Sequence, residues 1–492
     1  MAQHVDFLII GAGVSGIGAA CHLRRHFPDG SFAILEAMDG IGGTWWTHRY
    51  PGARSDSDLF TYGYSFKPWR GKSIATADEI RHYLDEVIED NALAPHIRFQ
   101  HQVASADWSS QDKRWTVKVT RGDTGETLTY TAGFLWMCAG YYDHGKGYTP
   151  EWEGMQDFQG RIVHPQHWPK DLDYADKQVV VIGSGATAAT LIPNMANETA
   201  HVTMLQRSPT FFACEPWAHP LEEQLRPLDL PDDWFHEIMR RAFIAKTDEV
   251  VRLAREQSDD LREVLLQETR TRLPEGYDVD THFNPRYRPW QQRIAVIPDG
   301  DLFAAIRSGK ASVVTDTIER FDATGIRLRS GRHLAADIVV TATGFNMQFL
   351  GGVPFRLDGK PVDFTQHMTW RGMMVQGIPN MAHTIGYFRY SWTLRADLVS
   401  DLVCRVLAHM RATGHEVVVP TLGAADADMP REPWTDPTTV SAGYMLRAQD
   451  KLPRQGNRSP WQAPWKQMHE YGDERTALPA LQPATEATLS YH

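Results

Sequence analysis

Two short runs of apolar residues, each followed by a glycine-rich loop and a segment that can form a helix, organise the first half of the chain. FLII (residues 7–10) runs into GAGVSG (11–16), and VVVI (179–182) runs into GSGATA (183–188). Strands that are apolar on both faces are typical of parallel sheets covered by helices. The pattern predicts an α/β protein with two Rossmann-like dinucleotide-binding domains.

The first glycine loop has the spacing that dinucleotide binding requires. Gly11 permits a tight turn, Gly13 lets the backbone approach a pyrophosphate, and Gly16 lets the helix pack closely on the strand. The next strand-like run, SFAILE, ends at Glu36, 25 residues after Gly11, where a carboxylate would bind a ribose hydroxyl. An ordinary turn that contains glycine is the alternative interpretation.

The second unit repeats this pattern with a base in place of the acid. Gly183 and Gly185 precede a helix that starts near Ala186 and Thr187, and the run HVTMLQR ends at Arg207, 24 residues after Gly183. A guanidinium binds the 2′-phosphate of NADP, whereas a carboxylate repels it. We therefore expect FAD or NAD in the first unit and NADP in the second. The alternative for Arg207 is a solvated charge at a strand end.

Composition narrows the class of protein. A chain of 492 residues predicts two or three domains, and its formal charge of −11 argues against nucleic acid and anionic membranes as partners. No window approaches the roughly 20 apolar residues of a membrane span, and the N-terminal residues lack the pattern of a signal peptide, so a cytoplasmic protein is expected. The four cysteines form no CxxC pair, and no metal site is expected.

A third motif lies between the two units, and no helix or strand period connects its residues. FQGRIVHPQHWP (158–169) matches every fixed position of the FxGxxxHxxxWP fingerprint of type I Baeyer–Villiger monooxygenases, the class B flavoproteins. The matching residues are Phe158, Gly160, His164, Trp168 and Pro169. A second family pattern, GGxWxxxxYPGxxxD, is matched from Gly42 to Asp56. The chain resembles this family over most of its length, and in particular the branch that includes the ethionamide-activating monooxygenase.

The resemblance implies an enzyme that uses FAD, NADPH and O2. Through a C(4a)-peroxyflavin, such enzymes insert one oxygen atom next to a ketone carbonyl to give an ester or lactone, and they also oxidise sulfides. An N- or S-oxygenating flavin monooxygenase is the alternative, but its fingerprint usually ends in Tyr or Phe where this chain has Trp168-Pro169. The absence of CxxC disfavours a FAD disulfide reductase.

The same resemblance selects two candidate catalytic residues. Arg293, in NPRYRPWQQRIAVIPDGDLFAAI (284–306), falls on the family's active-site arginine. Its charge is expected to stabilise the deprotonated peroxide and to hold NADP. Asp56 is expected near the flavin, where it orients that guanidinium. Gln292 stands where many family members have Lys, so binding of the NADP 2′-phosphate rests more heavily on Arg207.

Further contacts with the cofactors are also expected from the resemblance. Thr44, Trp45 and Trp46 are expected to line the FAD. Trp392, at the start of a predicted helix, is a candidate for contact with flavin or substrate. His164 is expected to fix the linker between the domains by hydrogen bonds, with a conformational role favoured over acid–base catalysis.

The order of the motifs predicts three parts. Residues 1–145 and 346–492 are expected to form the FAD domain, and residues 146–209 and 285–345 the NADP domain. Residues 210–284 carry an amphipathic helical pattern and are expected to form a helical insertion that shapes the substrate cavity. The tail after about residue 475 is rich in Pro, Ala and Thr, which predicts an extended, loosely held end.

Overall fold

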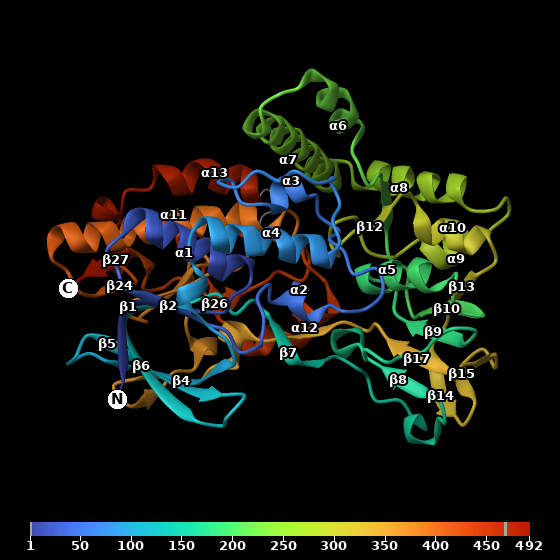
Figure 1. The fold of residues 1–492 in the computed structure, drawn as a ribbon, viewed down its shortest axis with the longest axis horizontal. Coiled ribbons are helices and arrows are strands. Elements are labelled where there is room, and N and C mark those ends of the chain that lie inside the picture. The colour runs from blue at the N-terminus through green and yellow to red at the C-terminus, as the bar shows by residue number, and fades with distance from the viewer. Residues whose placement is uncertain (1, 467–469) are drawn as a thin grey trace.

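The computed structural model describes residues 2–466 and 470–492, and its main framework is a pair of sheets built around parallel strands (Figure 1). The larger sheet has nine strands in the order β20-β19-β4-β5-β6-β1-β2-β3, with β23 paired to β6. These strands are β1 (Gln3–Ile10), β2 (Phe32–Leu35), β3 (Ile97–Arg98), β4 (His101–Ser109), β5 (Arg114–Arg121), β6 (Thr127–Met137), β19 (Phe355–Leu357), β20 (Lys360–Pro361) and β23 (Met381–His383).

The apolar run that opens the chain becomes a central strand buried on both faces. β1 pairs in parallel with β2 and β6, and Leu8 and Ile9 are fully buried. Ile9 packs with the core of α1 (Val14–His26), α4 (Ala77–Asp90) and α11 (Trp392–Thr413), whereas Leu8 packs toward β5 and the segment around Phe355. Packed residues therefore cover both faces of this parallel strand, as expected of a parallel sheet in an α/β protein. The predicted α/β class is confirmed.

The smaller core is an all-parallel sheet in the order β13-β10-β9-β17-β8. Its strands are β8 (Arg161–Val163), β9 (Gln178–Ile182), β10 (His201–Gln206), β13 (Ala311–Thr315) and β17 (Ile338–Thr341). The helices α5 (Ala186–Met195) and α10 (Asp301–Arg307) share one hydrophobic cluster with this sheet. The antiparallel strands β14 (Ile318–Asp322), β15 (Gly325–Leu328) and β16 (His333–Ala335) supply the cluster on its other face.

Two chain crossings connect the cores. β7 (Tyr142–Gly147) leaves the larger sheet and β18 (Phe345–Met347) returns to it, and the two strands pair antiparallel. The larger sheet draws its strands from residues 3–137 and 355–383, and the smaller sheet from residues 161–206 and 311–341. The finer domain boundaries stay a prediction.

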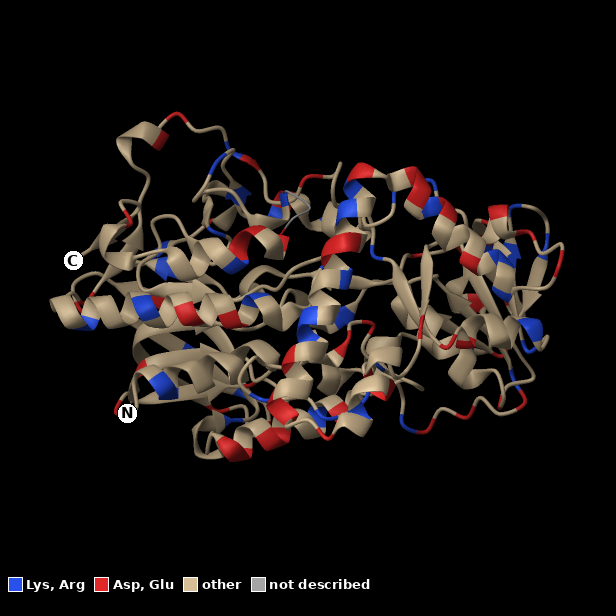
Figure 2. Ribbon diagram, turned by 90° about the horizontal axis from the view of Figure 1, so that it is seen from above, with Lys and Arg blue, Asp and Glu red and all other residues tan. Residues whose placement is uncertain are grey.

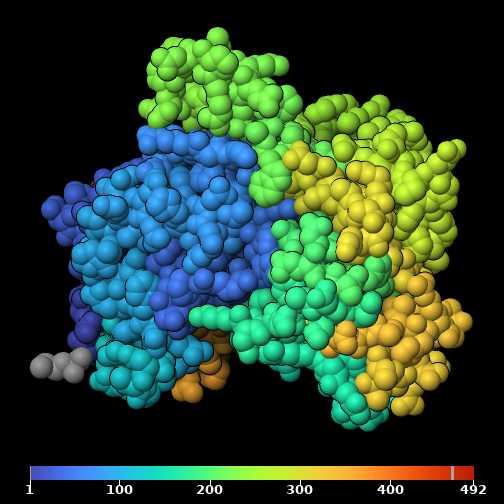
Figure 3. Space-filling model, turned by 45° about the vertical axis from the view of Figure 1, so that its right-hand side comes forward, coloured from blue at the N-terminus to red at the C-terminus, as the bar shows by residue number. Residues whose placement is uncertain are grey.

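A helical excursion projects from the body between the two cores (Figures 1 and 3). Its projecting part is formed by α6 (Pro220–Leu225) and α7 (Asp232–Glu256), whereas α8 (Ser258–Arg272) and α9 (Val279–Phe283) pack against the smaller core. The region is not purely helical, because β11 (Phe212–Glu215) pairs in parallel with β12 (Ala295–Pro298).

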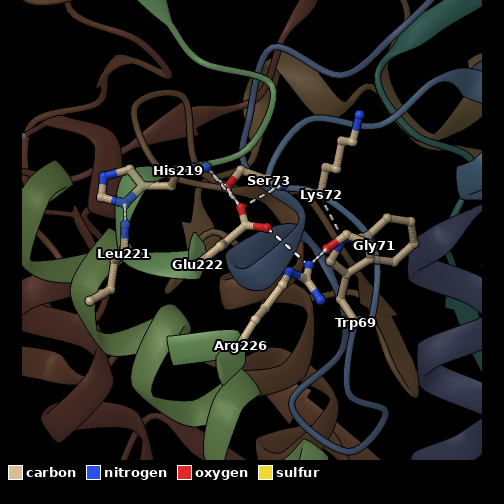
Figure 4. A network of polar contacts seen from close by, with 8 residues as sticks. All are labelled: Trp69, Gly71, Lys72, Ser73, His219, Leu221, Glu222 and Arg226. Atoms are coloured by element: carbon tan, nitrogen blue, oxygen red, sulfur yellow. Dashed lines mark hydrogen bonds and ion pairs between the residues drawn. The ribbon is translucent and has the colours of Figure 1, made fainter. Parts of the chain in front are cut away.

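Buried Glu222 fastens this excursion to the loop around Ser73 (Figure 4). Its Oε1 accepts hydrogen bonds from the backbone N–H groups of Ser73 at 3.0 Å and His219 at 2.9 Å. Arg226 Nη2 lies 3.2 Å from Oε2. The carboxylate therefore joins residues that belong to separate segments.

The C-terminal tail is ordered, so the prediction of a loosely held end was wrong. α13 (Glu470–Ala480) packs on α11, and Leu478 is 1% exposed. β27 (Leu489–Tyr491) then pairs with β24 (Val418–Pro420). Tertiary contacts such as the Arg405 Nη2 hydrogen bond to the Leu478 carbonyl, 2.7 Å long, override the weak local propensity of the segment.

Charged residues of both signs are interspersed along the outer helices (Figure 2). Within the described residues, no helix is both long enough and apolar enough to cross a membrane.

Candidate active site

The two glycine loops have the same backbone geometry at their first glycine. Gly11 has φ +104°, and a Cβ there would lie 2.6 Å from the Cys138 carbonyl oxygen. Gly183 has φ +129°, and a Cβ there would lie 2.2 Å from the Ala342 carbonyl oxygen. In each core, a larger residue would collide with the strand end beside the loop.

The helices behind these loops begin without side-chain caps. α1 starts after Gly13 and α5 after Gly185, and neither helix has an acidic residue in its first turn. Their first N–H groups are therefore available to an anion, and the helix dipole favours negative charge at this place. This arrangement fits a pyrophosphate at each helix start.

A cavity of about 560 Å³ extends from the first glycine loop to the start of α5. Ten of the residues expected to act at the site line it, namely Gly11, Gly13, Glu36, Thr44, Trp45, Asp56, Ala186, Thr187, Arg293 and Trp392. The cavity therefore has walls from both cores. Ten others do not line it, namely Gly16, Trp46, Gly183, Gly185, Arg207 and the five fingerprint residues Phe158, Gly160, His164, Trp168 and Pro169.

Glu36 holds the first glycine loop in addition to facing the cavity. Its Oε2 accepts from Ala12 N at 2.7 Å, and its Oε1 accepts from Met38 N at 2.9 Å. Burial raises the pKa of the Glu36 carboxyl, and these backbone hydrogen bonds oppose the rise. Each carboxylate oxygen keeps a further lone pair for a ligand hydroxyl.

Of the three residues after Gly43, the first two line the cavity and the third lines a different pocket. Trp45 donates from Nε1 to the Tyr62 hydroxyl at 2.7 Å and lines the cavity with Thr44. Trp46 points elsewhere, donates to Asp39 Oδ1 at 3.0 Å and lines a separate pocket of about 300 Å³. Contact between Trp46 and a flavin stays a prediction.

Arg293 and Asp56 form a bidentate ion pair inside the cavity. Arg293 Nη2 donates to Asp56 Oδ1 at 2.6 Å, and Nε donates to Oδ2 at 2.5 Å. Ser57 Oγ accepts a third hydrogen bond from Nη2 at 3.1 Å. The Arg293 side chain lies among protein atoms, but 41% of it is accessible to solvent because it faces the cavity.

The Arg293 guanidinium remains protonated and positively charged. Burial lowers its pKa, but the negative charge and hydrogen bonds of Asp56 outweigh burial and raise the pKa above its ordinary value. The pair therefore presents a fixed cation to the cavity.

The segment that carries Asp56 also contacts the second core. Arg54 Nη1 pairs with Asp301 Oδ2 of α10 at 2.7 Å, and a Cβ on Gly52 would meet the Asn194 side chain of α5 at 2.1 Å. Sequence reasoning missed Arg54, although its place inside the YPGxxxD pattern was a usable signal.

His164 contacts both crossings between the cores. Its Nε2 lies 3.1 Å from the Gly344 carbonyl oxygen, and its Nδ1 accepts from Gln166 N at 3.2 Å. A Cβ on Gly147 would lie 2.1 Å from the imidazole. Burial lowers the pKa of His164, and the Gly344 contact opposes this. These contacts fit a neutral ring that donates from Nε2.

The rest of the fingerprint packs around the smaller sheet, which explains its lack of a regular period. Phe158 is buried edge-on to Phe321, with ring centroids 6.1 Å apart. A Cβ on Gly160 would lie 2.3 Å from the Asp337 carbonyl oxygen. Trp168, followed by Pro169, makes an edge contact with Tyr174 at 6.4 Å. Each fixed position has a different partner.

Trp392 begins α11, as the sequence predicts, and links this helix to the first glycine loop. Its Nε1 donates to Ser15 Oγ at 2.7 Å. Arg207 follows β10 and is exposed at the end of the strand.

Several aromatic residues that sequence reasoning missed also line the cavity, among them Tyr141, Tyr142, Phe345, Phe388 and Tyr444. Tyr141 and Tyr142 directly follow the apolar run FLWMCAG, and a pair of aromatics at a strand end was the available signal.

The described residues contain no group of three or more His, Cys, Asp and Glu side chains that could hold a metal ion. The four cysteines are free, and three of them (Cys21, Cys138 and Cys404) are buried.

Comparison with known proteins gives a consistent result. Residues 8–230 match the family model described as pyridine nucleotide-disulphide oxidoreductase. The chain is 49% identical over 463 residues to the FAD-containing monooxygenase EthA of Mycolicibacterium smegmatis, a match that covers 94% of this chain and 92% of that protein. Identity to EthA of Mycobacterium tuberculosis is 48%, with 94% and 93% covered.

Among solved structures, a cyclohexanone monooxygenase from Rhodococcus sp. Phi1 bound to NADP+ superposes with a TM-score of 0.77 at 19% identity. That match covers 100% of this chain and 99% of the other. The shared architecture therefore extends over the whole chain.

Proposed function

The chain belongs to the family of FAD-containing monooxygenases, and we propose that it is an NADPH-consuming Baeyer–Villiger enzyme. It inserts one oxygen atom of O2 next to the carbonyl of a small ketone to give an ester or lactone, with sulfide oxidation as a further activity. The observation that carries this proposal is the Arg293–Asp56 pair, held inside the cavity that the first glycine loop and the start of α5 border.

The residues of the first core fit FAD. Gly13 and the uncapped start of α1 suit its pyrophosphate, and Glu36 suits a ribose hydroxyl. Thr44, Trp45 and Trp392 border the same cavity and suit contact with the rest of the cofactor. When bound, the flavin receives hydride from NADPH and supplies the activated oxygen.

The residues of the second core fit NADP. Gly185, Ala186 and Thr187 form the uncapped start of α5, and Ala186 and Thr187 reach the cavity. Arg207 is exposed at the end of β10, where its guanidinium can pair with a 2′-phosphate. Arg293 would hold the nicotinamide half of the coenzyme beside the flavin site.

Arg293 supplies positive charge where negative charge develops on oxygen. Because Asp56 binds its Nε and Nη2, the guanidinium is fixed before the reaction and does not reorganise during it. Asp56 thus orients the cation, and Ser57 adds a third contact. Cofactors and substrate bound in the cavity would displace water from it, which would strengthen this electrostatic effect.

Product analysis tests the proposal. The purified, FAD-loaded protein is incubated with NADPH, 18O2 and a ladder of linear 2-ketones, cyclic ketones and aryl ketones. We expect esters or lactones that carry one 18O atom. Oxidation of sulfides or amines without ester from any ketone would contradict the proposal and favour N- or S-oxygenation. Consumption of NADPH alone is not diagnostic, because uncoupled flavin also produces hydrogen peroxide.

A further inference from the structure

Three tyrosines from two distant segments meet on one wall of the cavity. Tyr141 and Tyr142 follow β6, and Tyr444 lies in α12 (Gly443–Ala448). The Tyr444 ring lies 6.3 Å from that of Tyr141 and 5.7 Å from that of Tyr142, measured between centroids. All three side chains line the cavity that contains Arg293.

The wall around these hydroxyls is made of aromatic rings. Tyr141 stacks on Trp392, with centroids 5.2 Å apart and planes 13° apart. Tyr142 packs on Phe345 at 4.4 Å, and Phe388 makes an edge contact with Tyr141 at 6.3 Å. Such a wall suits a compact apolar molecule, and the phenol groups are its polar points.

Of the three hydroxyl protons, those of Tyr142 and Tyr444 remain available to a ligand. Tyr141 donates to the Tyr142 hydroxyl at 3.0 Å, so its proton is committed. The Tyr444 hydroxyl lies within hydrogen-bonding reach of the Tyr141 and Tyr142 hydroxyls. A phenol carries a single proton, and Tyr444 can turn it toward the cavity.

The hydroxyls remain protonated beside the guanidinium. Burial raises the pKa values of Tyr141, Tyr142 and Tyr444, and the positive charge of Arg293 only partly opposes this. Arg293 Nη1 makes no hydrogen bond with a described residue, although Nε and Nη2 are engaged by Asp56. The cavity therefore holds a neutral donor and a fixed cation.

We propose that Tyr444 is a specificity-determining residue whose hydroxyl donates a hydrogen bond to the carbonyl oxygen of the substrate. Tyr141 and Tyr142 hold that hydroxyl in place, and the surrounding rings contact the apolar part of the ketone. The inference rests on the proposed ketone oxidation and adds a recognition contact to it. It favours ketones with a flat group next to the carbonyl.

Equilibrium binding to the oxidised FAD-loaded protein tests this contact without turnover. Acetophenone and ethylbenzene, which differ by the carbonyl oxygen, are titrated while the flavin absorbance or the heat of binding is followed. In Tyr444→Phe we expect the acetophenone Kd to rise about three- to tenfold, as loss of one neutral hydrogen bond predicts. The ethylbenzene Kd should not change.

Matched variants make the result specific. Tyr277→Phe removes a phenol outside the cavity and should leave both Kd values unchanged. Tyr444→Met removes the hydroxyl with a flexible side chain and should show the same selective loss, which guards against a defect peculiar to phenylalanine. In steady state, Tyr444→Phe should raise KM for the ketone more than it lowers kcat.

Several outcomes would overturn the inference. They are an unchanged acetophenone Kd in Tyr444→Phe, an equal loss for ethylbenzene, a loss of NADP+ affinity instead, or no acetophenone binding by the parent. If the parent binds acetophenone through Tyr444 but forms no ester from any ketone, the proposed function fails and the contact stands. If ester forms and Tyr444→Phe binds acetophenone as the parent does, the contact alone fails.

Discussion

Asp56 and Arg293 are 237 positions apart in the sequence, and their side chains meet in a bidentate ion pair with Nη2–Oδ1 at 2.6 Å. Asp56 comes from a loop of the first glycine-loop core, and Arg293 comes from the segment that precedes β12. The pair therefore forms only when the two parts of the molecule are assembled. The pair presents to the cavity a cation that a carboxylate holds in place.

Removal of the cation should abolish oxygen transfer and spare the earlier step. In Arg293→Ala we expect reduction of the flavin by NADPH to remain measurable, and ester formation to fall by at least about 100-fold. Stopped-flow absorbance measures the first quantity and product analysis the second. Arg293→Lys keeps the charge without the planar fork and should retain intermediate activity. Ester formation by Arg293→Ala at the parent rate would show that the role assigned to this residue is wrong.

Loss of the orienting carboxylate should misplace the cation. Asp56→Asn removes the charge that fixes the guanidinium, and we expect ester formation to fall roughly 10- to 100-fold while more hydrogen peroxide is released. Ser57→Ala removes only the 3.1 Å contact and serves as the mild control. Equal ratios of ester to peroxide in Asp56→Asn and the parent would argue against this positioning role.

Arg207 should determine the choice of coenzyme. Arg207→Ala removes the proposed charge-assisted partner of the 2′-phosphate, so we expect KM for NADPH to rise about tenfold or more. NADH lacks this phosphate, and its KM is the internal control that should change little. A similar rise for both coenzymes would indicate a general defect of the domain instead.

Acid should destabilise the protein through its buried histidines. Burial lowers the pKa of His383 from its ordinary 6.5 to about 3, with the charge of Arg395 acting in the same direction. The folded state therefore binds this proton less readily than the unfolded state. The resulting stability is fully present above pH 6.5 and is lost progressively as the pH falls toward 3.

The variant His383→Phe removes this proton-binding site. Between pH 4 and pH 6.5 we expect its free energy of unfolding, measured with urea, to fall less steeply with acid than that of the parent. Above pH 7 the two proteins should show the same flat dependence on pH, whatever their absolute stabilities. Identical slopes in the acid range would rule out His383 as a source of acid sensitivity.

The buried carboxylate of Glu222 should stabilise the helical excursion. Glu222→Ala leaves the N–H groups of Ser73 and His219 without their acceptor, which we expect to cost about 2–4 kcal/mol of unfolding free energy. Thermal unfolding checks the loss, and limited proteolysis should cut within residues 220–256 faster than in the parent. Glu223→Ala alters the exposed neighbour on the same helix and should be close to neutral.

The local sequence pattern predicted those features that depend mainly on residues close together in the chain. The apolar runs that end at Gly11 and Gly183 predicted two parallel-stranded cores, because a strand buried on both faces needs apolar residues at every position. Gly11 and Gly183 were identifiable for a related reason, since a tight turn beside a neighbouring strand excludes a side chain.

Contacts between distant segments could not be predicted from the local sequence pattern. The resemblance to a family selected Arg293 from several nearby arginines, but its bidentate contact with Asp56 depends on the placement of two loops from different cores. The tail after residue 475 has little helical propensity of its own and becomes ordered by packing on α11. Tyr444 joins Tyr141 and Tyr142 only after α12 returns to the first core. Sequence by itself determined the two nucleotide-binding frameworks, and tertiary structure alone decided which side chains face each other across the cavity, because that depends on how loops far apart along the chain pack together.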